Sequence, residues 1–104
     1  MIKNLSQLKK ALVPGADFEV IDHWRPKYIG QRRKVNIANT QGIYSIIPED
    51  PKSKVTTANC GRGTWLAWGK ASDWEFDGDT ATRYDSYGAE KHINIKIKVL
   101  GGSV

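Results

Sequence analysis

Alternating hydrophobic and polar positions dominate the chain after residue 15 and predict a protein built mostly of short β-strands. The clearest alternation lies in His92–Leu100, where each odd-numbered position from 93 to 99 is Ile or Val and the even-numbered positions between them are Asn or Lys. Period-2 alternation of this kind is typical of an antiparallel strand that buries one face and exposes the other. We therefore predict a half-buried strand at the C-terminal end.

Six further segments have the strand pattern, with Phe18, Val20, Val35 and Ile37 expected to point inward. The polar turn at residues 39–42 predicts that its two flanking segments form a hairpin, and residues 24–30 are expected to form a loop. The predicted strands are Asp17–His23, Arg32–Asn39, Ile43–Ile47, Thr64–Trp68, Asp73–Phe76 and Thr80–Tyr84.

One helix is predicted near the N-terminus, over residues 4–12. Asn4 is a suitable N-cap, Gln7 occupies the capping-box position, and the leucines at 5, 8 and 12 fall on one stripe. The sequence Val-Pro-Gly at 13–15 ends it. A helix this short is not stable alone, so its leucine stripe must pack on other elements.

The predicted fold class is α+β and mostly β, with one short N-terminal helix packed on an antiparallel sheet or small open barrel of six to seven strands. The length of 104 residues is appropriate for one domain. We expect a single domain over residues 1–100 and a flexible C-terminal tail over residues 101–104.

Three of the four tryptophans lie in the segment Gly61–Phe76. Trp68, Trp74 and Phe76 are expected in the core, because large aromatic side chains are mostly buried. Trp65 shares a strand with Trp68 but points to the opposite face, so one of the two faces outward unless both faces of the sheet are covered. Burial remains the more common state for Trp65 as well.

Composition indicates a folded protein outside the membrane. Hydrophobic residues make up 39% and charged residues 26% of the chain, which are ordinary values for globular domains. No apolar run approaches the ~20 residues of a membrane-spanning helix, and residues 1–15 lack the apolar region of a signal peptide. The single cysteine, Cys60, excludes an internal disulfide framework. We expect a cytoplasmic protein.

Charge is unevenly distributed along the chain, whose net charge is +5. Between residues 23 and 70, nine Lys and Arg face two acids, a net of +7. Between residues 71 and 90, six acids face one arginine, a net of −5. A dipolar surface could steer a charged partner, whereas blocks that interleave in space would cancel.

Motifs of enzymes and cofactor sites are missing. The sequence has no P-loop, no Gly-x-Ser-x-Gly and no Cys-x-x-Cys. Cys60 could pair with His23 or His92, but a nucleophile requires a geometry that sequence does not supply, and these residues lack zinc-ligand spacing. Asp-Gly-Asp at 77–79 is typical of a turn. We expect no catalysis, no cofactor and no metal.

The positive feature is a set of basic residues interleaved with aromatic ones. Cations that follow phosphates and rings that stack on bases bind single-stranded nucleic acid in this way, while aromatic and Arg side chains are also the usual anchors of protein interfaces. The candidate binding residues are Trp24, Arg25, Lys27, Arg32, Arg33, Lys34, Tyr44, Arg62, Trp65 and Lys70.

Four segments together resemble a family of small uncharacterised accessory proteins of phages and conjugative elements of Gram-positive bacteria. The segments are Leu5–Leu12, Gly15–Phe18, Ala58–Gly63 and Trp68–Phe76, and the resemblance covers most of residues 1–76, with Gly-Lys-Ala-x-x-Trp its most distinctive part. It implies accessory or anti-defence roles, including anti-CRISPR inhibitors, which act by binding. It supplies no catalytic residues.

Two functions follow as expectations. The first is a non-enzymatic binding protein of mobile-element origin that acts on a host protein or nucleoprotein complex. The alternative is a domain that binds single- or double-stranded nucleic acid directly. The oligomeric state is left open by the sequence.

Overall fold

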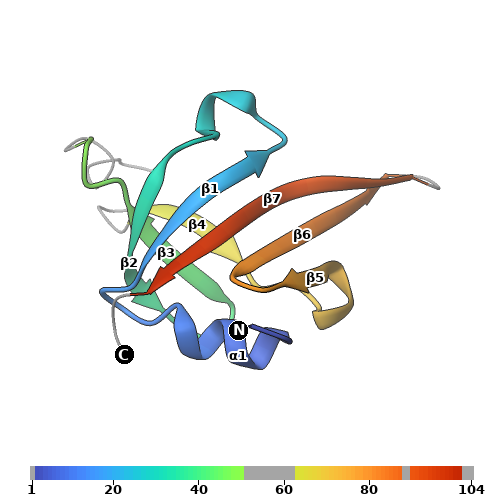
Figure 1. Ribbon diagram of the computed structural model, residues 1–104, viewed down its shortest axis with the longest axis horizontal. Helices are drawn as coiled ribbons and strands as arrows, with labels where there is room; N and C mark the ends of the chain where they lie inside the picture. The colour runs from blue at the N-terminus through green and yellow to red at the C-terminus, as the bar shows by residue number, and fades with distance from the viewer. Residues whose placement is uncertain (1, 51–62, 88–89, 102–104) are drawn as a thin grey trace.

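Seven β-strands form one antiparallel sheet, and α1 (Leu5–Ala11) packs across one of its faces (Figure 1). The computed structural model describes residues 2–50, 63–87 and 90–101. The strand order is β4-β3-β2-β1-β7-β6-β5. The strands are β1 (Asp17–His23), β2 (Arg32–Ala38), β3 (Gly42–Ile46), β4 (Thr64–Ala67), β5 (Trp74–Asp77), β6 (Thr80–Tyr87) and β7 (Glu90–Gly101), with 3₁₀ turns η1 (Pro26–Tyr28) and η3 (Ala71–Asp73).

This architecture confirms the predicted fold class, with an open sheet rather than a closed barrel. All neighbouring strands are antiparallel, and β2 and β3 form the expected hairpin. The predicted loop at 24–30 contains the short turn η1. The expected tail begins one residue too early, because Gly101 still pairs with Asp17 of β1; residues 102–104 lie outside the described part. The Cα radius of gyration, 13.2 Å, is that of a compact domain.

The helix begins and packs as its sequence predicts. The Asn4 side chain accepts a hydrogen bond from the Gln7 backbone N–H at 2.8 Å, while the Gln7 side chain accepts one from the backbone of Lys3 rather than from Asn4. Leu5, Leu8 and Leu12 are buried. Because α1 is too short to be stable alone, burial of this stripe on the sheet is what stabilises it.

The hydrophobic core lies between α1 and the sheet face that it covers, which we call the inner face. Phe18, Val20, Ile95 and Ile97 are fully or almost fully buried at its centre. Their positions match the alternation predicted for β1 and β7. Every strand contributes to the core or packs against it, through Phe18, Val20, Val35, Ile43, Leu66, Trp74, Phe76, Ala81, Ile95, Ile97 and Val99.

A β-bulge in β2 overturns the prediction that Ile37 points inward. Val35 lies opposite Ser45, but Ile37 lies opposite Tyr44, so β2 has one extra residue at this point. An extra residue reverses the side-chain alternation beyond it. Ile37 is consequently 40% exposed on the face opposite α1, which we call the outer face.

Two of the tryptophans connect the sheet's two edges. Trp68 follows β4 and Trp74 begins β5, and both are buried as predicted. The Trp74 indole N–H donates a hydrogen bond of 2.6 Å to the Trp68 carbonyl, and the Trp68 indole N–H donates to the Asn39 carbonyl. The sheet therefore curves so that its edge strands approach each other. Phe76 is half-buried beside Trp74.

Candidate binding surfaces

The first candidate surface is a row of apolar side chains on the outer face. Ile37, Tyr44 and Trp65 lie opposite one another on β2, β3 and β4. The rings of Tyr44 and Trp65 have centroids 4.6 Å apart and are tilted by 47°. Trp65 is 42% exposed, so the expectation that it is buried is wrong, while the alternative, an outward-facing Trp65 opposite a buried Trp68, is confirmed.

Glycine at position 42 makes room for the exposed indole. A Cβ atom added to Gly42 would lie 2.8 Å from Cη2 of Trp65 and would also collide with the backbone of Leu66. Contacts this short do not occur between real side chains. Gly42 therefore lets the Trp65 ring lie close to the backbone of β3, where Tyr44 packs against it. The ring is consequently held in place although much of its surface reaches water.

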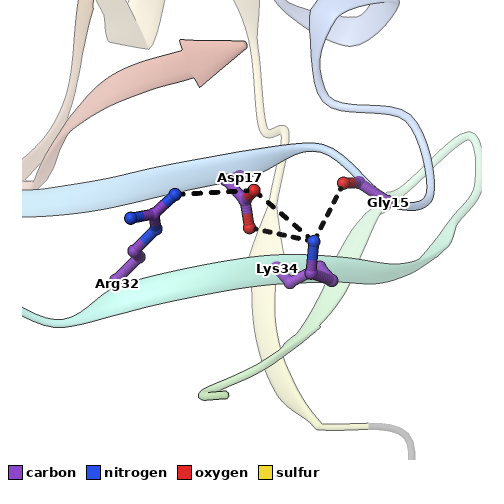
Figure 2. Close-up of polar contacts among 4 residues, drawn as sticks. All are labelled: Gly15, Asp17, Arg32 and Lys34. Atoms are coloured by element: carbon purple, nitrogen blue, oxygen red, sulfur yellow. Dashed lines mark hydrogen bonds and ion pairs between the residues drawn. The ribbon is translucent and has the colours of Figure 1, made fainter. Parts of the chain in front are cut away.

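A charged cluster lies on the same face and is drawn in Figure 2. The Lys34 ammonium is 3.2 Å from one carboxylate oxygen of Asp17, and the Arg32 guanidinium is 3.7 Å from the other. Lys34 also reaches the Gly15 carbonyl at 3.4 Å. The two cations are about half exposed. Exposed ion pairs contribute little to stability, so this cluster matters mainly for the charge it presents.

The charged cluster and the apolar row adjoin each other. Lys34 pairs with Ile46 of β3, and Ile46 is two positions from Tyr44 along the same strand, on the same face. A hollow of about 310 Å³ opens beside the cations and is also lined by Pro48 and Glu49. We call the combined surface the outer-face patch; it comprises Asp17, Arg32, Lys34, Ile37, Tyr44, Ile46 and Trp65.

The second candidate surface is the β1–β2 connection, at the end of the sheet away from α1 (Figure 1). The Arg25 guanidinium lies 4.4 Å from the centre of the Trp24 ring, and the Lys27 ammonium lies 5.0 Å from that of Tyr28. Pro26 fixes the first turn of η1. Trp24 is 58% exposed. We call this surface the loop cluster; it comprises His23, Trp24, Arg25, Lys27, Tyr28 and Arg33.

Arg33 contradicts the expectation that it is a surface cation. Its position alternates with Arg32 and Lys34, so it points to the inner face with Val35, and it is only 4% exposed. The guanidinium donates two hydrogen bonds to the side-chain oxygen of Gln31, at 3.0 and 3.3 Å, and lies 5.6 Å from the Tyr28 ring centre. Burial lowers the pKa of Arg33, because a charged group loses hydration there.

The pKa of His23 is affected by the charges of the loop cluster. Burial lowers the pKa of His23 most, and the positive charges of Arg33 and Arg25 lower it further, against the opposing effect of Asp22. The imidazole Nδ1 accepts a hydrogen bond of 2.9 Å from the Arg25 backbone N–H, which requires that this nitrogen carry no proton. The ring also contacts Tyr28 edge-on. A neutral histidine in a positive environment is the result.

The acidic segment at residues 71–90 is less separated from positive charge than its sequence predicts, because β7 lies beside it. The acidic segment lies mainly on β5 and β6, at the opposite end of the strand order from β4, but β7 pairs with β6 and brings its lysines next to it. Glu75 accepts hydrogen bonds from Lys91 and Tyr84; the bond from Lys91 is the largest cause that lowers the pKa of Glu75, followed by the bond from Tyr84. The acidic segment is therefore partly neutralised by its neighbour.

The structure thus separates the predicted binding residues into two groups. Arg32, Lys34, Tyr44 and Trp65 lie on the outer-face patch, and Trp24, Arg25, Lys27 and Arg33 lie in the loop cluster. Lys70 is exposed at the start of η3 and is assigned to neither group. Arg62 and Cys60 lie outside the described residues.

The candidates found in the sequence leave out five residues of these surfaces, namely Asp17, His23, Tyr28, Ile37 and Ile46. Asp17 was assigned only to a strand, and its cross-strand pairing with Lys34 depends on register. Ile37 was placed inward, because nothing in the sequence marks the bulge. Tyr28 was visible as an aromatic residue between Lys27 and the cations at 32–34, and that interleaving was the signal that could have identified it.

Comparisons with protein-family models, curated proteins and solved structures find no match to this chain. Within residues 2–50, 63–87 and 90–101, no three His, Cys, Asp or Glu side chains gather closely enough to hold a metal ion. The same residues include no helix with the length and hydrophobicity needed to span a membrane.

Proposed function

We propose that this protein is a non-enzymatic binding protein whose outer-face patch docks on a protein target. The observation that supports the proposal is the row of Ile37, Tyr44 and Trp65 on the sheet face opposite α1, in which Ile37 and Trp65 are exposed and Tyr44 is half-buried. A Trp–Tyr pair that is held in place but partly exposed can be buried by a partner at little cost in side-chain entropy. Such aromatic residues are the most frequent energetic anchors of protein interfaces.

The charges beside this row favour a protein over a nucleic acid as the partner of the patch. Arg32 and Lys34 both approach Asp17, and Glu49 lines the same hollow. Two carboxylates therefore offset two cations, so the patch offers little net attraction for phosphates. An apolar centre with a mixed-charge rim is instead the usual composition of a protein–protein interface.

The class of target follows from the resemblance to accessory proteins of phages and conjugative elements. We propose a host protein or nucleoprotein complex as the target, with a defence effector as the specific class and an anti-CRISPR or other anti-defence inhibitor as the role. Inhibition by occupying a surface requires affinity and no chemistry, which is consistent with an exposed aromatic centre.

The experiment is a comparative capture from a host lysate with three purified proteins: wild type, Trp65→Ala and Ile29→Ala. Ile29 is the matched control, because it is an exposed apolar residue (48% against 42% for Trp65) outside the patch. Truncation of an interface anchor costs about 2–4 kcal/mol, so Trp65→Ala should lose the captured protein. Ile29→Ala should retain it, with or without nuclease treatment.

Two results would overturn the proposal. One is equal recovery of the same protein by wild type and Trp65→Ala. The other is recovery that disappears on nuclease treatment, since the patch would then not be contacting protein. Circular dichroism of all three proteins checks that each variant is folded.

A further inference from the structure

The loop cluster carries a second, independent function: we propose that it binds single-stranded nucleic acid, with one base on Trp24 and phosphates on Arg25 and Lys27. This inference does not rest on the protein-binding proposal, because it uses other residues at another end of the sheet. Its first support is the exposure of Trp24, 58% of whose surface reaches solvent. An exposed indole offers a face on which a base can stack.

The charge of the loop cluster differs in kind from that of the outer-face patch. Arg25, Lys27 and Arg33 each lie against an aromatic ring rather than a carboxylate. The ion pairs of the described residues involve other cations, namely Arg32, Lys34 and Lys91. Asp22 lies beside His23 and Asp85 lines the neighbouring hollow, but neither acid forms an ion pair with Arg25 or Lys27. Because the charge of these two cations is not neutralised by a direct partner among the described residues, they can attract phosphates. Arg33 is buried and contributes through its field, whereas Arg25 and Lys27 can reach a ligand.

A hollow beside Trp24 can accommodate a base. It has a volume of about 310 Å³ and is lined by Trp24, Asp85, His92 and Ile93, which places it at the lower end of the size range of small-ligand pockets. Ile93 supplies an apolar wall. Asp85, held by a 2.6 Å hydrogen bond from the Asn94 amide, and His92 supply polar groups that can contact the edge of a base.

The form of the nucleic acid follows from this geometry. In a duplex, the faces of the bases are stacked on their neighbours and cannot be reached by an indole without unstacking. A single strand presents its bases freely, and recognition by stacking tolerates any base. The structure therefore assigns a single strand as the ligand; RNA and DNA share the chemistry used here.

The test measures binding of fluorescently labelled ten-nucleotide strands, oligo-dT and oligo-U, by anisotropy at several salt concentrations, with a matched duplex in parallel. Wild type should bind at least one of the single strands more tightly than the duplex. With two phosphate contacts, log K should fall against log salt with a slope of about −1.4. Comparing the affinities for oligo-dT and oligo-U distinguishes a DNA ligand from an RNA ligand.

Variants connect the binding to the named residues. Trp24→Ala should weaken binding by roughly 5- to 150-fold, the range for loss of one stacked base, and Trp24→Phe should restore part of it. Lys27→Ala should reduce the salt slope by about 0.7. The controls are Ile29→Ala, exposed on the same connection, and Lys10→Ala, an exposed lysine of α1; both should bind as wild type does.

A second readout is the titration of His23, followed by NMR. The groups that face it are Asp22, Arg25, Tyr28 and Arg33, and its neighbour on β7 is the apolar Ile95. A bound phosphate opposes the field of the arginines, so the pKa of His23 should rise on addition of the oligonucleotide. No binding at low salt would overturn the inference. So would equal affinity of wild type and Trp24→Ala, or an unchanged pKa of His23 at saturation.

Discussion

The hydrogen bond between Trp74 and Trp68 provides the sharpest test of how this sheet is held in its curved form. Replacing Trp74 by phenylalanine keeps an aromatic ring but removes the indole N–H that donates to the Trp68 carbonyl at 2.6 Å. Trp74 is only 6% exposed, so water cannot easily replace the lost donor. The variant therefore leaves a buried carbonyl without this partner.

The magnitude can be worked out from two contributions. A buried acceptor that loses its hydrogen bond costs about 1–3 kcal/mol. The smaller ring also removes ~40 Å² of buried apolar surface, worth about 1 kcal/mol. Together they predict a loss of about 2–4 kcal/mol in the free energy of unfolding, a large fraction of the ~5–15 kcal/mol typical of a domain.

The assay is urea unfolding followed by circular dichroism. With a urea slope of ~1.5 kcal/mol/M, the midpoint should fall by about 1–3 M. The matched control is Trp65→Phe, in which the same substitution is made at a residue that is 42% exposed on the outer face; there we expect a change below about 1 kcal/mol. If the two variants lose equal stability, the bond between the edges does not hold the sheet as argued.

Three further predictions concern burial, protonation and backbone conformation. Arg33→Glu should destabilise the protein by about 3–5 kcal/mol, because it places an uncompensated carboxylate at a site that is only 4% exposed. Arg32→Glu, at the surface, should cost less than about 1 kcal/mol. Similar urea midpoints for the two variants would contradict this prediction. The pKa of His23 is lowered from 6.5 in the folded protein. The contribution of neutral His23 to stability is therefore present above pH 6.5 and is lost as the pH falls through the folded-state pKa. An NMR titration that gives His23 a pKa above 6.5 would reverse the sign of this pH dependence. Gly63→Ala should lower the free energy of unfolding by more than about 1 kcal/mol, because Gly63 has a φ of 107° and the Cβ of alanine would collide with the Ser45 carbonyl. A thermal midpoint equal to that of wild type would refute the clash.

Several elements could be predicted because their cause is local. The leucine stripe of α1 and its Asn4 cap, the alternation of β1 and β7, and the opposite orientations of Trp65 and Trp68 all depend on residues a few positions apart. Periodicity fixes which side chains share a face, independently of what the strand pairs with. The fold class and the element bounds follow from such patterns to within a few residues.

The composition of the two surfaces depended instead on register and pairing. Arg32 and Lys34 join Tyr44 and Trp65 only because β2, β3 and β4 are neighbours in a particular register, and Ile37 joins them only because of a bulge. Arg33 lies two positions before Val35, which the sequence already places inward, so the alternation of β2 was the signal that separates it from Arg32 and Lys34. A charged side chain is rarely buried, which is why that signal was not used.

The sequence by itself determined that the chain is mostly β, with one short helix on an antiparallel sheet, because hydrophobic periodicity acts over a few residues. The tertiary structure alone decided that the basic and aromatic residues divide into two surfaces of different charge. Among the described residues, Asp17 forms ion pairs with the cations of the outer-face patch, whereas the cations of the loop cluster form none. Both outcomes depend on which side chains meet across strands, and such contacts are set by the packing of the whole sheet.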